Sequence, residues 1–391
     1  MILSDVCEFI VDCPHSTAPD EGEGYPLIRT PNVGKGRLDL NGVHRVSESV
    51  YKQRIQRGAP RANDLIFARE APAGNVALVQ ENQTVCLGQR TVLIRPNVQK
   101  VNPQYLVYYL LSPKPQYELL GTANGATVAH VNLPAIRNLK IELPEKSVQD
   151  KIGTILVTYD DLIENNQKQI KLLEEAAQRL YKEWFVDLRF PGHENSKIVD
   201  GVPEGWSKST VGNICKLRKV VITPDKIESN TPYIGLEHMP RNDICLSTWG
   251  KSEEINSNKF IYLKKDVLFG KIRPYFHKVG FALNDGITST DTMVMVADQN
   301  LWGLLLVTVS SDAFVDFSYQ NCKEGAKMPR ADWKQMEKYA IMIADQATQK
   351  LFEQEILVIT NKISALAFQC RSLREARDRM LPKLMGGEVE A

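Results

Sequence analysis

The sequence predicts an α+β fold with two similar globular domains, two long helices and a pseudo-twofold internal repeat. Three observations carry this prediction. A Gly-Ala pair at Gly125-Ala126 occurs again at Gly325-Ala326, 200 residues later. A heptad pattern of apolar residues follows each pair. Short segments with the composition of strands precede each pair, bounded by turns rich in Gly, Pro and Asn.

The heptads predict two long amphipathic helices that pair through a seam. The first seam is apolar except for Asn166, and comprises Ile152, Leu156, Tyr159, Ile163, Asn166, Ile170, Leu173, Ala177, Leu180 and Trp184. The second lies 200 residues later, at Phe352, Ile356, Ile359, Ile363, Leu366, Cys370, Leu373, Arg377, Met380 and Leu384. At 1.5 Å per residue, roughly 35 residues form a rod of about 50 Å.

Asn166 bears on whether the two helices pair parallel or antiparallel. In a parallel pair in register it would face Leu366, which offers its amide no partner. An antiparallel pair would bring it near another layer, such as that of Cys370 or Arg377. The alternative is that each helix packs on its own globular neighbour, because apolar stripes more often face a core than a zipper.

Local signals divide the chain. Ser147 followed by Asp150 resembles a capping box and predicts the start of the first helix. The helical pattern breaks at Phe190-Pro191-Gly192. Matched strand segments, Asp64–Phe67 with Asp266–Phe269, indicate one scaffold used twice. We therefore expect a first globular domain at 1–144, a helix at 145–190, a second globular domain at 191–343 and a final helix at 344–391.

Composition narrows the class of protein. The chain of 391 residues is 43% hydrophobic, which is enough for two or three cores. Its seven cysteines are scattered, which favours free thiols in a reducing cytoplasm. We expect no metal site, since Cys7, Cys13 and His15 lack a fourth ligand at a suitable spacing. We expect no membrane association, because the apolar stretch at 301–309 is too short to span a bilayer.

Charge is unevenly distributed along the chain. The net charge is only +1, but the local balance is +6 between Arg29 and Arg69 and +5 between Lys259 and Lys278. The two basic segments occupy roughly equivalent places in the two halves. A single run of this kind usually solvates a surface, whereas two matching runs favour a nucleic-acid partner.

Several motifs together resemble the specificity subunit of type I restriction-modification enzymes. The strongest part runs from Leu143-Pro-Glu-Lys-Ser-Val-Gln-Asp-Lys-Ile152 through Glu175-Ala-Ala-Gln-Arg-Leu-Tyr-Lys-Glu-Trp-Phe185 to Arg189-Phe-Pro-Gly192. The Val202–Trp206 entry to the second half is also typical of the family, and the similarity covers essentially the whole chain. One departure is Ile343-Ala344, where the first copy has Leu143-Pro144.

The resemblance implies two target-recognition domains separated by two long antiparallel coiled-coil helices. Each domain would read one half of a bipartite site in double-stranded DNA, and the helices would set the spacer between the two halves. Two methyltransferase subunits would flank the helices, and restriction subunits would complete the endonuclease. Catalysis would then belong to these partners, together with S-adenosylmethionine, ATP and Mg, so that this chain has no catalytic residue and no cofactor of its own.

The residues themselves favour the same division of labour. Gly34-Lys35-Gly36 lacks the preceding loop and the hydroxyl residue of a phosphate-binding motif. Two other classes stay open: a coiled-coil protein scaffold without DNA specificity, and a stand-alone duplicated nuclease.

Basic and amide side chains are the candidates for contact with DNA, since cations neutralise phosphates while Arg, Asn and Gln read base edges. In the first half they are Arg29, Asn32, Lys35, Arg37, Arg69, Arg90, Thr127 and Asn132, and in the second half Arg218, Lys219, Lys271, Arg273, Tyr275, Lys327 and Arg330. Four apolar residues off the seam would suit either a partner subunit or the chain's own domains: Leu162, Leu172, Tyr181 and Phe185.

Overall fold

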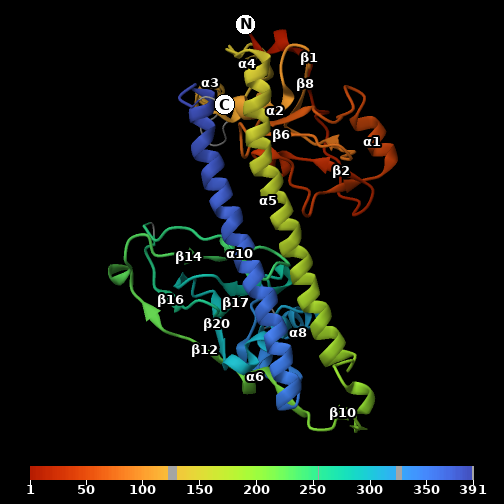
Figure 1. Cartoon of the computed structure of the whole chain (residues 1–391), viewed down its shortest axis with the longest axis vertical. Helices are drawn as coiled ribbons and strands as arrows, with labels where there is room; N and C mark the ends of the chain where they lie inside the picture. Colours follow the sequence, from red (N-terminus) through yellow and green to blue (C-terminus); the bar gives the residue numbers. More distant parts are fainter. Residues whose placement is uncertain (122–129, 254, 323–327, 390–391) are drawn as a thin grey trace. The chain divides into compact units, whose positions relative to one another are not determined.

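The computed structural model describes residues 1–121, 130–253, 255–322 and 328–389. They form two compact units, Met1–Glu164 with Ser372–Ala391 and Asn165–Arg371, which we call the first unit and the second unit. The long helices α5 (Lys146–Tyr181) and α10 (Gln346–Met385) each contribute to both units (Figure 1). Their first residues lie close to the helix starts predicted at 145 and 344.

The first unit is built on a five-stranded sheet of order β1-β8-β5-β6-β3. Its strands are β1 (Cys7–Asp12), β3 (Gly36–Arg37), β5 (Leu65–Ala68), β6 (Val76–Leu78) and β8 (Thr91–Pro96). A smaller sheet contains β2 (Tyr25–Ile28), β4 (Arg45–Val46) and β7 (Cys86–Leu87). The short helices are α1 (Glu48–Arg54), α2 (Pro103–Leu111), α3 (Pro113–Gly121) and α4 (Leu133–Arg137).

The second unit repeats this plan with a five-stranded sheet of order β12-β20-β17-β18-β15. Its strands are β12 (Cys215–Leu217), β15 (Cys245–Leu246), β17 (Val267–Gly270), β18 (Val279–Ala282) and β20 (Thr292–Ala297). A four-stranded sheet contains β13 (Val221–Ile222), β14 (Tyr233–Ile234), β16 (Lys259–Tyr262) and β19 (Gly286–Thr288). Two-stranded pairs join β9 (Ile198–Val199) with β10 (Val202–Pro203), and β11 (Ser207–Thr210) with β21 (Ala340–Ile343).

Four short helices complete the second unit: α6 (Val211–Ile214), α7 (Trp302–Val309), α8 (Asp312–Gln320) and α9 (Trp333–Met336). The strands β5 and β17 hold the same central place, and both sheets pair their third and fourth strands antiparallel and their fourth and fifth parallel. The predicted internal repeat is therefore confirmed.

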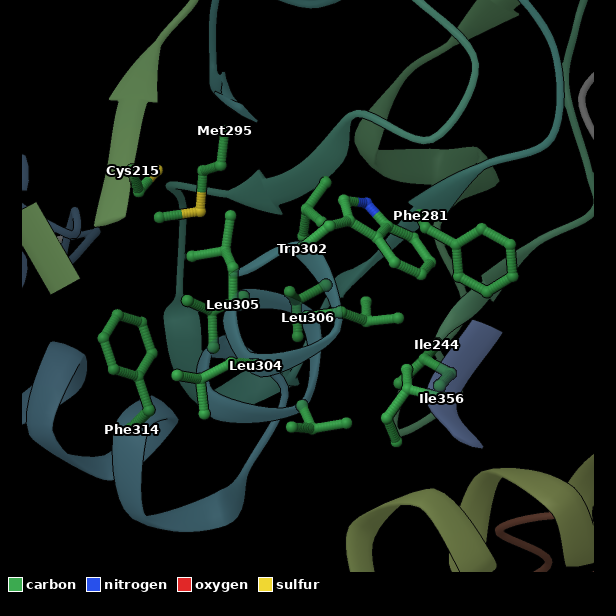
Figure 2. Close-up of a cluster of buried hydrophobic side chains, with 14 of the residues drawn as sticks. Cys215, Ile244, Phe281, Met295, Trp302, Leu304, Leu305, Leu306, Phe314 and Ile356 are labelled. Atoms are coloured by element: carbon green, nitrogen blue, oxygen red, sulfur yellow. The ribbon is translucent and has the colours of Figure 1, made fainter. Parts of the chain in front are cut away.

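Each central strand is buried on both faces, which explains why its sequence is a continuous apolar run. In the first unit Leu65 and Phe67 pack with α2, while Ile66 and Ala68 pack in a separate cluster on the other face. In the second unit Val267 and Phe269 share a core with the apolar helix α7. Figure 2 shows Leu304, Leu305 and Leu306 of this helix among Phe281, Met295, Phe314 and Ile356.

The long helices run antiparallel, as the predicted fold class requires. In the first unit Arg377 of α10 bonds to Asp160 of α5. In the second unit the side-chain amide of Asn166 donates to the Oε1 of Gln369 at 3.4 Å, and the rings of Trp184 and Phe352 lie 5.6 Å apart. Residue numbers thus fall along α10 as they rise along α5. Asn166 finds its partner beside Cys370, one of the two layers that an antiparallel pair offers.

The seam residues also pack on the globular parts of their own unit. Ile152 and Leu156 share a core with α2, and Phe352 and Ile356 share one with α7. Pairing of the helices and packing on a globular neighbour were predicted as alternatives, and both occur. Each helix contacts both the other helix and a sheet-bearing domain. None of the helices in the described part of the chain combines the length and the apolar character needed to cross a bilayer.

Candidate nucleic-acid interface

The same backbone junction occurs in both units, where the central strand ends. In the first unit the N–H of Arg69 donates to the carbonyl of Arg90 at 2.9 Å, and the N–H of Val131 donates to the carbonyl of Arg69 at 3.0 Å. In the second unit the backbone N–H of Lys271 donates to the carbonyl of Asp291 at 2.8 Å, and the N–H of Ala331 donates to the carbonyl of Lys271 at 2.9 Å. The repeat thus brings three segments of the sequence together in each unit. Predicted DNA-binding residues lie on or next to all three in the first unit (Arg69, Arg90, Asn132) and two in the second (Lys271, Arg330).

Three predicted cations gather at the junction of the second unit. Burial lowers the pKa of Lys271, and the positive charges of Lys219 and Arg330 lower it further, while Asp291 opposes them. Like charges have this effect only at short range. Arg330 pairs with Asp291 at 2.9 Å, and the Nζ of Lys271 donates to the carbonyl of the neighbouring Thr290 at 2.7 Å. We call Lys219, Lys271 and Arg330 the basic cluster of the second unit.

Two further predicted residues lie on the loop that follows Lys271. The N–H of Arg273 donates to the carbonyl of Pro329 at 2.8 Å, which ties the loop to the segment before Arg330. Tyr275 is exposed and its ring lies 5.2 Å from the ring of Tyr319, a residue of α8 that sequence reasoning missed. Since only the packing of α8 on this loop joins the two tyrosines, no sequence spacing could have revealed Tyr319.

Arg218 has a different place. Its guanidinium contacts both carboxylate oxygens of buried Asp266, at 2.8 and 3.3 Å. The first unit contains an equivalent ion pair, in which the guanidinium of Arg95 donates to both carboxylate oxygens of Asp64 at 2.9 and 2.7 Å. Asp64 and Asp266 are the equivalent residues that precede the central strands. Arg218 therefore stabilises the sheet instead of facing solvent at the basic cluster.

At the first junction, Arg69 is 8% exposed and fully engaged. Its Nε donates to the carbonyl of Val131 at 2.8 Å, one terminal nitrogen to Asp12 at 2.6 Å, and the other lies 2.7 Å from the Nε2 of His130. His130 in turn contacts Glu70, with which Arg90 forms an ion pair of 2.8 Å. Arg69 therefore anchors the segment that starts at His130, and exposed Arg90 is the cation that faces solvent.

The remaining candidates of the first unit are dispersed. Asn32 is buried, accepts the N–H of Arg29 at 3.1 Å and donates to the carbonyl of Asp39 at 3.2 Å, so that it shapes a turn. Arg37 pairs with Asp161 of α5, while Lys35 beside it is exposed. Arg29 and Asn132 are half-buried. Thr127, Lys327 and the two Gly-Ala pairs lie outside the described residues.

The four apolar residues off the helix seam divide into two kinds. Leu162 and Leu172 are exposed. Tyr181 is half-buried and Phe185 is buried, with its ring 5.2 Å from that of Trp206 and 4.7 Å from that of Phe352. The first pair leaves apolar surface for a partner, and the second pair serves the core of the second unit.

The described ranges hold no group of three or more His, Cys, Asp or Glu side chains placed to bind a metal ion. The seven cysteines are free thiols. The candidate site is a surface of cations with one aromatic pair in the second unit, which suits recognition of a polyanion.

The chain is similar to known proteins in sequence and in fold. A family model described as "Type I restriction modification DNA specificity domain" matches residues 1–175. The chain is 25% identical to the type I restriction enzyme MjaIX specificity subunit of Methanocaldococcus jannaschii over 379 residues, which cover 89% of this chain and 82% of that protein. It is 26% identical to the EcoBI specificity subunit of Escherichia coli over 195 residues, which cover 46% of this chain and 40% of that protein.

Among solved structures, the chain is similar to the S subunit of a type I restriction-modification system from M. genitalium. The TM-score is 0.58 at 14% sequence identity, and the match covers 98% of this chain and 95% of that one. At this level of identity the match shows a shared fold.

Proposed function

We propose that this chain is a specificity subunit of a type I restriction-modification enzyme and that each of its units reads one half of a bipartite site in double-stranded DNA. The chain is the non-catalytic DNA-recognition component of such a complex. The observation that carries the proposal is the repeated junction, which brings cationic side chains to the end of the central strand in both units.

The partner subunits supply the chemistry in this proposal. Two methyltransferase subunits dock on the long helices, where exposed Leu162 and Leu172 offer apolar surface, and restriction subunits complete the endonuclease. S-adenosylmethionine, ATP and Mg belong to those partners. Seven free thiols support a cytoplasmic location.

The salt dependence of DNA binding tests the proposal. The purified complex of this chain with its methyltransferase partner should bind a target duplex with an affinity that falls steeply as salt rises, because phosphate contacts release counterions. Arg90→Ala and Lys219→Ala should each reduce the slope of log K against log salt by about 0.9, because each substitution removes one cation that neutralises a phosphate.

The matched control is Lys52→Ala, which removes an exposed cation of α1 that lies outside both junctions and pairs with Glu48. Its slope should equal that of the unchanged complex. A flat salt dependence would favour a protein-only scaffold, and cutting of DNA by the purified chain with Mg²⁺ alone would favour a nuclease.

A further inference from the structure

Two tyrosine rings lie together on the surface of the second unit. Tyr275 belongs to the short helix η7 (Pro274–Phe276) and Tyr319 to α8, and their ring planes meet at 76°. Each residue is 46% exposed. Edge-to-face packing stabilises an aromatic pair, yet here much of the apolar ring surface is left in water. The pair is therefore a candidate for contact with something outside the chain.

The loop that presents Tyr275 is held at both ends. On one side the N–H of Arg273 bonds to Pro329, and on the other the Nε2 of His277 lies 2.9 Å from the carbonyl of Ser310. Between them the guanidinium of Arg241 stacks 4.0 Å from the centre of the Phe276 ring.

The backbone of this loop is also unusual. Arg273 and His277 adopt left-handed conformations, with φ of 51° and 50°, which are unfavourable for residues other than glycine. Such conformations persist where surrounding contacts determine them, and they concentrate at binding sites. Tyr275 is thus fixed in an outward position before any ligand binds.

The aromatic pair is not a requirement of the scaffold. The equivalent loop of the first unit, between β5 and β6, continues after its proline with Ala73 and Gly74, where the second unit has Tyr275 and Phe276. The first unit keeps the same strand order and the same junction without these rings. The rings therefore serve something that differs between the two units, as the target of each unit does.

Charge identifies the class of partner. Arg273 lies on the loop of Tyr275, Arg241 packs on the neighbouring Phe276 ring, and the loop is bonded to the segment that precedes Arg330. This environment suits a polyanion better than an apolar protein surface. We infer that Tyr275, supported by Tyr319, contacts the bases of the second half-site through apolar ring surface. This inference rests on the proposed function: the cations bind phosphates and fix position, while the ring contributes to the choice of sequence.

The test separates ionic from apolar contacts. The complex with the methyltransferase partner is titrated, over a range of salt, with its target duplex and with a duplex whose second half-site is scrambled. Tyr275→Ala should weaken binding to the target roughly tenfold, leave the scrambled duplex unaffected and leave the salt slope unchanged. Tyr275→Phe keeps the ring and should bind like the unchanged complex.

Lys219→Ala is the contrasting variant, because it should reduce the salt slope on both duplexes. Tyr319→Ala should weaken target binding by less than Tyr275→Ala, with the same unchanged slope. Thermal unfolding of each variant complex shows that the second unit remains folded.

The inference is overturned if Tyr275→Ala binds the target normally, or if it weakens both duplexes equally. If Tyr275→Ala binds the target normally but Lys219→Ala reduces the salt slope, the inference fails while the proposed function stands. The proposed function itself fails if the unchanged complex does not distinguish the two duplexes and Lys219→Ala alters nothing.

Discussion

At the scale of single residues, Asp160 connects three helices of the first unit. It is buried in α5, accepts the hydroxyl of Tyr108 at 2.6 Å and bonds to the guanidinium of Arg377 from α10. Burial, followed by the charge of Asp160, raises the pKa of Tyr108. One carboxylate thus joins α2, α5 and α10.

Asp160→Ala should destabilise the first unit by about 3 kcal/mol, because it removes the acceptor of the buried Tyr108 hydroxyl and leaves Arg377 with only the exposed Asp378 as its ion-pair partner. The control is Asp161→Ala, which removes the exposed partner of Arg37 and should cost less than about 1 kcal/mol. Chemical unfolding followed by circular dichroism measures both. Equal effects of the two substitutions would show that the Asp160 network contributes no more than a surface pair.

The sequence singled out charged residues such as Arg377, but it did not predict which side chains they pair with. Arg377 was the one charged residue in the second seam, but its partner became visible only when antiparallel register placed it beside Asp160. Arg69 and Arg218 were candidates for DNA contact, yet distant carboxylates hold both, Asp12 for the first and Asp266 for the second. Nothing in a local pattern distinguishes an arginine with such a partner from one that faces solvent.

At the scale of elements, the long helices contact the short helices of the two units through different interactions. In the second unit Glu353 of α10 accepts the N–H groups of Gly303 and Leu304 at 2.6 and 3.0 Å, and so caps α7. In the first unit Gly153 holds the equivalent place on α5, and a Cβ there would lie 3.0 Å from the nitrogen of Tyr105. There α2 is capped by its own Asn102.

Glu174 makes a similar bridge from α5 to the edge strand β15, and it predicts a pH effect. Its Oε1 accepts the N–H groups of Ile244 and Cys245 at 3.0 and 3.1 Å. Burial, with help from Asp243, raises the pKa of Glu174 to about 8. The folded state therefore binds a proton that the unfolded state has already released above about pH 5.

The stability of the second unit should accordingly fall as pH rises from about 5 to about 8, by up to about 1.4 kcal/mol per pH unit from this group. Glu174→Gln keeps an oxygen for both N–H groups and removes the titration, so that this decline should flatten. Urea unfolding of both proteins across this range measures the difference, and parallel curves would exclude Glu174 as its source.

Elements with a strong period were predictable from the sequence, whereas contacts between elements were not. The helices α5 and α10 begin within two residues of the predicted 145 and 344, although Ser147 lies inside α5 and not at its cap. The segments at 64–67 and 266–269 form central strands. The continuous apolar runs of those strands reflect burial on both faces, which their neighbours in sequence do not reveal. The Tyr275 and Tyr319 pair likewise required the packing of α8 on η7.

At the scale of the whole molecule, duplication is the property that sequence revealed most directly. Two units with one strand order, each including part of both long helices, follow from a shift of 200 residues between copies. We propose that the helices also set the number of base pairs between the half-sites. That role gives helix length a measurable consequence.

Inserting one heptad into each helix, after Glu164 in α5 and after Arg371 in α10, should lengthen the spacer. These points fall at the boundary between the units, and in sequence they lie between the pairs Asp160–Arg377 and Asn166–Gln369, so that antiparallel register is kept. Seven residues add about 10 Å of helix, or about three base pairs at 3.4 Å each. Sequencing of methylated adenines in cells that express the variant with its methyltransferase reports the spacer.

Lengthening α5 alone is the control for this experiment. It displaces every contact between α5 and α10 on one side of the insertion, including either the Asp160–Arg377 bond or the Asn166–Gln369 bond. This variant should therefore abolish DNA methylation instead of directing it to sites with a longer spacer. A double insertion that methylates the original sites with the original spacer would show that helix length does not determine the distance between half-sites. Loss of modification in the double insertion with retained binding to a longer-spaced duplex would still place the spacing function in the helices.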